Sequence, residues 1–84
     1  MTRSLAVEYA SSNILINSIS PGFTYTELTK KSLSDVEIKS ISSQVPMGRF
    51  AQPKEIAKVV LFLSSNLNTY LTGQNIIVDG GRSI

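Results

Sequence analysis

Two short apolar segments, far apart in the chain, most constrain what this sequence folds into. The first is Ile14-Leu15-Ile16 together with Ile19, and the second is Asn75 to Val78. The residues between them carry helical periodicity. Two strands separated by a helical crossover favour a parallel pair in an α/β sheet. The nearly continuous apolar run at Ile14-Leu15-Ile16 predicts a strand covered on both faces.

Helices are predicted before and between these strands. Leu5 and Tyr9 recur at helical spacing and Ser11-Ser12-Asn13 breaks the pattern, so a helix from residue 1 to about 11 is expected. Ser34 followed by Glu37 fits a capping box, which starts a second helix. Its apolar face is formed by Ile38, Ile41 and Val45, and Pro46 stops it.

A third helix is predicted to start at Pro53, because a proline fits the first turn, where its missing N–H has no helical partner. It should end within residues 64–68. Lys54 and Lys58 are expected to point outward. The buried face is expected to consist of Ile56, Val59, Val60 and Leu63.

Composition narrows the function classes. The 84 residues fit one small domain, and 42% hydrophobic with 17% charged residues is typical of a globular chain. The chain has no cysteine and no histidine, which excludes disulfides, Ser-His-Asp catalysis and nearly every zinc site, so no metal site is predicted. Lys30 and Lys31 are the only adjacent basic pair, so no nucleic-acid surface is expected. Ile56 to Leu63 is too short to span a bilayer, and a cytoplasmic protein is expected.

A loop with ligand-binding potential follows the first predicted strand. It reads Pro21-Gly22-Phe23-Thr24-Tyr25-Thr26. Open α/β sheets bind ligands at the carboxyl ends of their strands. Backbone groups freed by the Pro-Gly turn and the Thr26 hydroxyl suit a carboxamide. From physics alone, an ordinary connecting loop is the favoured alternative.

Three stretches carry a family resemblance: Asn17 to Phe23, Arg49 to Ala57, and Thr72 to Gly81. Read together, they resemble the C-terminal part of a short-chain dehydrogenase/reductase. The resemblance implies that residues 1–84 are a C-terminal fragment of a single NAD(P)-binding domain. The fold class expected from it is α/β, the C-terminal portion of a Rossmann-type doubly wound parallel sheet with two parallel strands and about three helices.

The same resemblance implies cofactor-binding positions. The family's Pro and Gly fall on Pro21 and Gly22. Its backbone contact to the carboxamide falls on Thr24, and its cofactor-binding threonine falls on Thr26. The cofactor implied for the complete enzyme is NAD or NADP, and the choice between the two stays open.

Other segments have a functional and a structural interpretation. Ser34 to Val45 resembles the family's substrate lid, and a surface helix is an equal alternative. Arg49 suits an anionic substrate, but a hydrogen bond to nearby carbonyls is favoured. Glu55 lies in a helix's first turn, where a carboxylate complements the helix dipole, so a structural role is favoured over that of a general acid. Asp79 is also interpreted as structural.

The chain lacks the family's Tyr-x-x-x-Lys pair and its glycine-rich turn. Tyr9, Tyr25 and Tyr70 each lack a lysine four residues later, so no catalytic residue is assigned. The first hypothesis is a C-terminal part of an NAD(P)-dependent oxidoreductase, acting on a carbonyl or alcohol and supplying the nicotinamide-side loop, the lid and an interface strand of a homo-oligomer. The alternative is a non-catalytic interaction or oligomerisation module derived from that fold. The sequence leaves the substrate open.

Overall fold

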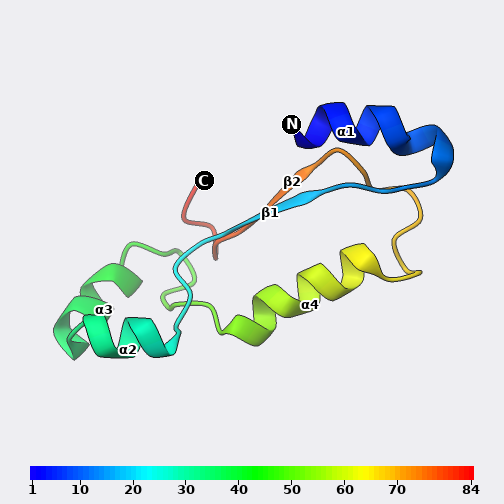
Figure 1. Ribbon diagram of the computed structural model, residues 1–84. Helices are drawn as coiled ribbons and strands as arrows, with labels where there is room; N and C mark the ends of the chain where they lie inside the picture. Colours follow the sequence, from blue (N-terminus) through cyan, green and yellow to red (C-terminus); the bar gives the residue numbers. More distant parts are fainter.

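The computed structural model describes all 84 residues as a small α/β unit (Figure 1). Its two strands, β1 (Ser18–Pro21) and β2 (Asn75–Val78), pair in parallel, with Ser18 opposite Asn75 and Pro21 opposite Val78. The predicted parallel pair is therefore confirmed, and β2 has the predicted bounds. The helices are α1 (Thr2–Tyr9), α2 (Glu27–Ser32), α3 (Asp35–Ser42) and α4 (Pro53–Ser64), with a 3₁₀ turn at Ala10–Ser12.

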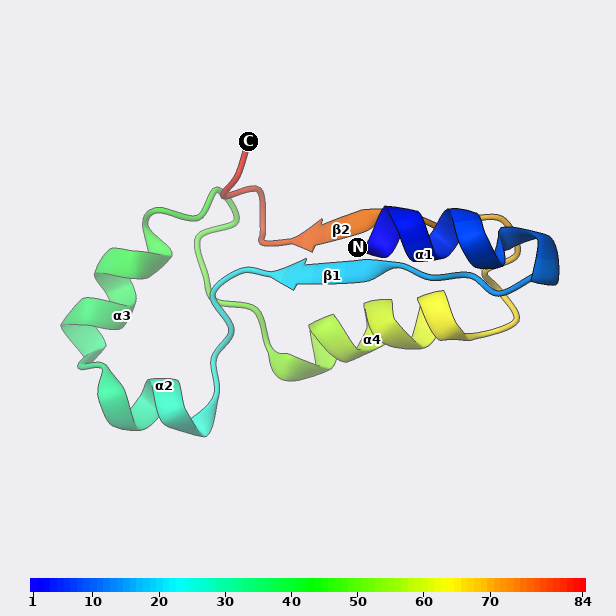
Figure 2. The ribbon, with the colours of Figure 1, turned by 45° about the horizontal axis from the view of Figure 1, so that its top comes forward.

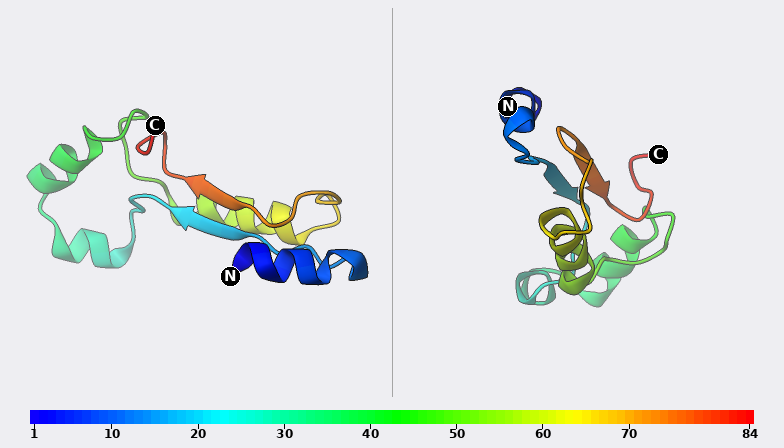
Figure 3. Two further views of the ribbon diagram at one scale, coloured as in Figure 1. Left: turned by 90° about the horizontal axis from the view of Figure 1, so that it is seen from above. Right: turned by 90° about the vertical axis from the view of Figure 1, so that its right-hand side faces the viewer.

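Two layers of helix flank the strand pair. Figures 1 and 3 show α1 and α4 on opposite sides of β1 and β2. The α4 side chains Val60 and Leu63 line a hollow shared with Ile19 of β1. On the other side, a Cβ added at Gly73 would lie 3.3 Å from the Ala6 Cβ, so α1 packs closely on the turn before β2.

The pair α2 and α3 projects away from the strands, and the molecule is elongated as a result (Figure 2). Its extents are 50 × 23 × 20 Å and its radius of gyration is 15.7 Å. A compact chain of this length would have a radius of gyration of about 12 Å. The only buried apolar residues are Ala6, Val45 and Phe50. The chain therefore has a thin core for its length.

The first strand begins later than predicted. Ile14-Leu15-Ile16 lies before β1, and Ile14 is 48% exposed, so the expectation of a strand covered on both faces is wrong. The reason lies in the partner segment. Ile16 N–H donates to Thr72 Oγ1 at 2.9 Å, and Gly73 N–H donates to the Ile16 carbonyl at 2.7 Å. Gly73 has a φ of +74°, which is not a strand conformation, so the regular ladder starts only after it.

The helix predictions hold with three corrections. The first is the end of the second helix: α3 ends at Ser42, so Val45 lies outside it and Pro46 does not stop it. The capping box of α3 is present, with Glu37 N–H donating to Ser34 Oγ and Ser34 N–H donating to the Glu37 carboxylate. Helix α2 was not predicted. On α4, Lys54 and Lys58 are exposed as expected, and Ile56, Val59 and Leu63 are half-buried. Val60 is 48% exposed, so its placement on a buried face is wrong.

No helix in this structure is long and apolar enough to cross a membrane.

Candidate functional site

The carboxyl ends of both strands meet at one edge, and there the loop after β1 touches the turn after β2. Gly22 N–H donates to the Val78 carbonyl at 2.9 Å, which extends the ladder by one bond beyond Pro21. A Cβ added at Gly22 would lie 2.7 Å from the Asp79 Cβ and 2.8 Å from the Asp79 Cα. Glycine is thus required for the two chains to approach here. The structure brings Pro21 and Gly22 together with Asp79, a contact that sequence reasoning did not foresee.

Gly22→Ala is expected to destabilise the fold by about 3 kcal/mol, because the new methyl group overlaps backbone atoms that cannot rotate away. The comparison is Gly48→Ala. Gly48 has a φ of +77° but no atom within 4 Å of an added Cβ, so only the conformational cost of about 1 kcal/mol applies. Urea unfolding followed by circular dichroism, at a concentration where the unmodified chain is folded, measures both. Equal unfolding midpoints for the two variants would show that the close approach of Gly22 to Asp79 does not require glycine.

Asp79 has a structural role in the turn that follows β2. Its carboxylate oxygens accept hydrogen bonds from Gly81 N–H and Ser83 N–H, each at 3.0 Å. Hydrogen bonding by the Ser83 side chain, together with the backbone N–H groups, holds the pKa of Asp79 below its usual range. Nearby, the Arg82 guanidinium lies 4.7 Å from the Phe23 ring centroid. Arg82 therefore covers one face of the loop after β1.

The loop after β1 is held by a third extended segment. Thr24 and Ala51 form an isolated parallel bridge, in which Ala51 N–H donates to the Phe23 carbonyl at 2.9 Å and Tyr25 N–H donates to the Ala51 carbonyl at 2.8 Å. The buried Phe50 ring lies 5.7 Å from the Phe23 ring and 6.3 Å from the Tyr25 ring. The loop is therefore ordered by backbone pairing and aromatic contacts.

Thr24 and Thr26 use their polar groups differently. Thr24 Oγ1 donates to the Gly22 carbonyl at 3.2 Å and the Thr24 carbonyl accepts from Thr29 Oγ1, but the Thr24 backbone N–H has no partner within the chain. Thr26 caps α2, with its Oγ1 accepting from Thr29 N–H at 3.3 Å. The Thr26 side chain is exposed at the start of that helix. One free backbone donor and one exposed hydroxyl thus lie two residues apart on the loop.

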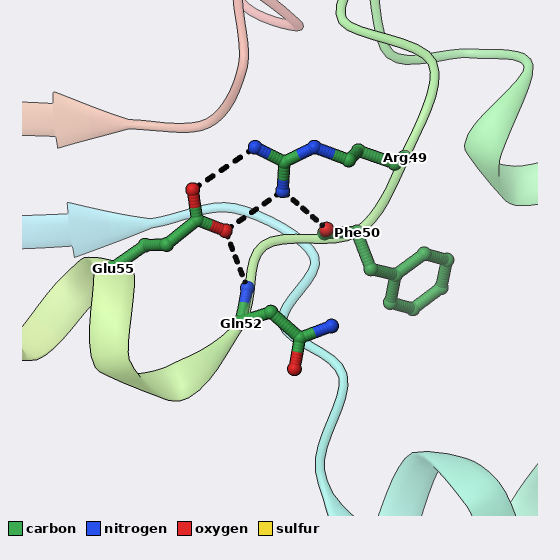
Figure 4. A network of polar contacts seen from close by, with 4 residues as sticks. All are labelled: Arg49, Phe50, Gln52 and Glu55. Atoms are coloured by element: carbon green, nitrogen blue, oxygen red, sulfur yellow. Dashed lines mark hydrogen bonds and ion pairs between the residues drawn. The ribbon is translucent and has the colours of Figure 1, made fainter.

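Arg49 and Glu55 form a bidentate ion pair beside the site (Figure 4). The two guanidinium nitrogens donate to the two carboxylate oxygens at 2.7 and 2.9 Å, and Arg49 Nη1 also donates to the Phe50 carbonyl at 3.1 Å. The Glu55 carboxylate accepts Gln52 N–H at 2.8 Å. The predicted carbonyl bond of Arg49 is confirmed, and Glu55 lies in the first turn of α4 as expected. Their mutual ion pair was not predicted.

The hydrogen bonds to Glu55 keep its carboxyl group ionised at a lower pH than is usual for a glutamate. The Arg49 side chain and then the Gln52 backbone N–H lower the pKa of the carboxyl from 4.5 to about 2. A carboxyl whose folded pKa is depressed adds stability above its unfolded pKa, and this is lost as the pH falls through the folded value. The stability difference between the unmodified chain and Glu55→Gln should therefore be present above pH 4.5 and vanish towards pH 2. A carbon-detected NMR titration of Glu55 with a midpoint near 4.5 would contradict this.

A cavity of about 90 Å³ lies between the ends of the strands and the segment that returns from α3. Val45, Met47, Arg49 and Gly80 are among its lining residues. The structure contains no group of three or more Asp, Glu, His or Cys side chains arranged to hold a metal ion. Arg49, Glu55 and Asp79 line the cavity, so its wall is partly charged, and Thr24 and Thr26 lie outside it. The loop itself offers the free Thr24 N–H and the exposed Thr26 hydroxyl, which suit a neutral polar group such as an amide.

Comparison with known proteins identifies the family. The sequence model of the enoyl-(acyl carrier protein) reductase family matches residues 1–83. The chain belongs to the short-chain dehydrogenase/reductase family.

Individual relatives are similar over the whole chain. It is 44% identical to the 3-oxoacyl-(acyl-carrier-protein) reductase FabG of Thermotoga maritima, covering 100% of this chain and 34% of that protein. It is 43% identical to the NAD-dependent glycerol dehydrogenase of Listeria innocua, covering 33% of that protein. Among solved structures, ElxO with NADP bound is 36% identical with a TM-score of 0.89, over 98% of this chain and 34% of ElxO. The chain thus spans about a third of the length of these relatives, whose fold class is the Rossmann-type α/β fold.

Proposed function

We propose that residues 1–84 form the C-terminal part of an NAD(P)-dependent oxidoreductase and supply its nicotinamide-side loop. Family membership supports the hydride-transfer class. The observation that carries the assignment is the free Thr24 backbone N–H at the carboxyl end of β1, where open α/β sheets bind ligands. Pro21 and Gly22 set the turn that presents it. ElxO, a relative of this chain, is a protein with NADP bound.

Within this proposal each part of the chain has a distinct task. The Thr24 N–H donates to the carboxamide oxygen of the nicotinamide, and the Thr26 hydroxyl contacts the same end of the cofactor. The segment Ser34 to Val45, which contains α3 and projects from the strands, covers the substrate as a lid. The cofactor supplies or accepts the hydride when bound. The proton-transfer residues and the glycine-rich phosphate turn come from outside these residues, and strand β2 contributes to contacts between subunits.

The test is a graft of residues 1–84 into ElxO in place of the aligned third. The graft is expected to bind NADP, with binding measured by isothermal titration calorimetry. A correctly folded graft that binds no NADP, while ElxO binds it under the same conditions, would overturn the proposed role.

Thr26→Ala in this graft is expected to weaken NADP binding by about 1 kcal/mol, the net scale of one hydrogen bond. Because Thr26 also caps α2, the substitution removes a structural contact as well. Thr26→Ser is the matched control, since it keeps a hydroxyl for both tasks. Calorimetric titration of NADP into the two variants measures the combined effect of losing the hydroxyl. A dissociation constant that Thr26→Ala leaves unchanged would remove Thr26 from the cofactor site.

The alternative is a non-catalytic interaction or oligomerisation module. It is favoured by the number of large apolar side chains left on the surface, among them Leu61, Leu67 and Tyr70, which are 69%, 77% and 97% exposed. Such residues suit contacts with another polypeptide. A folded chain that is monomeric at high dilution, or a graft without cofactor binding, would favour this alternative.

A further inference from the structure

The segment Arg49–Gln52 is the surface on which the loop after β1 is built. It forms the bridge between Thr24 and Ala51, and it carries the buried Phe50 ring against Phe23 and Tyr25. Yet none of its residues lies in a strand or helix, and Ala51 forms only an isolated bridge. Something other than secondary structure must fix its position.

The ion pair of Arg49 and Glu55 holds the segment in place at both of its ends. Arg49 is its first residue, and its guanidinium is held by both oxygens of Glu55. Gln52 is its last residue, and its N–H donates to Glu55 Oε1. Between them, the Phe50 carbonyl accepts from Arg49 Nη1. A single carboxylate on the rigid first turn of α4 therefore holds both ends of a four-residue segment.

We infer that Arg49 and Glu55 are positioning residues for the loop Phe23 to Thr26, acting through the bridge between Thr24 and Ala51. The consequence for cofactor binding rests on the proposed function, because that loop carries the free Thr24 N–H. Neither side chain needs to touch the cofactor. Bidentate arginine–carboxylate pairs combine two charge-assisted hydrogen bonds with a fixed orientation, which suits a positioning task.

The matched control is Glu37, the corresponding carboxylate of α3. Like Glu55, it lies in a first turn and accepts a backbone N–H, that of Ser34 at 3.0 Å. It has no ion-pair partner and makes no hydrogen bond to the loop after β1. Glu55→Gln and Glu37→Gln therefore remove the same charge from the same kind of position, and only the first breaks the ion pair.

The primary test is amide hydrogen exchange on the full 84-residue chain, read by NMR. In Glu55→Gln, the amides of Tyr25 and Ala51 should exchange about tenfold faster, while Ser18 and Gly22 in the β1–β2 ladder stay unchanged. Arg49→Met should behave in the same way, and Glu37→Gln should leave all four amides unchanged. No acceleration, or an equal acceleration at all four amides, would overturn the inference. Should the unmodified chain exchange at unstructured rates throughout, the same four amides are compared in the ElxO graft.

A second measurement asks whether the positioned loop serves the nicotinamide. In the ElxO graft, Glu55→Gln should raise the dissociation constant of NADP several-fold but leave that of ADP-ribose 2′-phosphate, which lacks nicotinamide, unchanged. An equal rise for both ligands would show a general structural effect and overturn the positioning role. A graft that binds neither ligand sinks the proposed function instead, and the exchange result on the bridge still decides the link between Arg49, Glu55 and the loop.

Discussion

The 84-residue chain alone is expected to transfer no hydride. Among its tyrosines, Tyr9 is followed four residues later by Asn13, Tyr25 by Thr29, and Tyr70 by Gln74, so no lysine is placed to lower a tyrosine pKa. The carboxyl edge of its sheet offers hydrogen-bond donors to a nicotinamide but no glycine-rich turn for a pyrophosphate. Positioning without proton transfer gives no turnover.

The measurement is oxidation of NADH and NADPH by the purified chain with ketone, aldehyde and sugar substrates. The rate of cofactor oxidation with the protein should equal the rate in buffer alone. The positive control is the NAD-dependent glycerol dehydrogenase of Listeria innocua, assayed in parallel with NAD and glycerol, together with a mock purification from cells that lack the gene. Turnover that follows the chain through several chromatographic steps and is lost in Thr26→Ala would refute the expectation.

The elements that were predicted correctly are those whose signals are local. Strand β2 and helix α4 are bounded by Gly, Pro and Ser residues next to them in sequence, and the capping box of Ser34 and Glu37 spans a single turn. Helix α2 was missed because its box uses Thr26 and Thr29, and a threonine in place of the usual Glu or Gln gives a weaker signal.

The errors share one cause, which is dependence on distant partners. The start of β1 is decided by Thr72 and Gly73, far away in the chain. Val60 has the correct helical spacing for a buried face, but only part of that face lies against β1. Amphipathic periodicity predicts which side of a helix is apolar, and it does not predict how much of that side finds a neighbour.

In the candidate site, too, the positions set by local signals were predicted and the contacts between distant residues were not. Pro21, Gly22, Thr24 and Thr26 were placed on a loop at the carboxyl end of a strand. The structure has Gly22, Thr24 and Thr26 there, and Pro21 is the last residue of β1. Their role in cofactor binding stays a prediction. The contact of Gly22 with Asp79 and the pairing of Arg49 with Glu55 depend on how the return segment folds back, which no spacing rule reveals.

The chain in isolation is expected to associate, and to unfold when association is prevented by dilution. Each strand of its two-stranded sheet has one unpaired edge, which presents backbone donors and acceptors to other chains. Only four of the 84 residues are buried, and neither a disulfide nor a histidine or cysteine metal site is available to compensate. Large apolar side chains remain on several elements, with Val7 79%, Leu61 69% and Ile77 54% exposed.

Sedimentation velocity and circular dichroism across a dilution series measure both effects on the same samples. At high concentration the sedimentation coefficient should exceed that of a monomer and helical signal should be present. On dilution the coefficient and the helical signal should fall together, because an obligate association makes stability depend on protomer concentration. Ile77→Lys is the informative variant: it places a charge on the exposed face of β2 and should shift the transition to higher concentration. If the chain remains a folded monomer with a sharp two-state melt at every dilution, it is a self-sufficient domain, and the non-catalytic module is the favoured function.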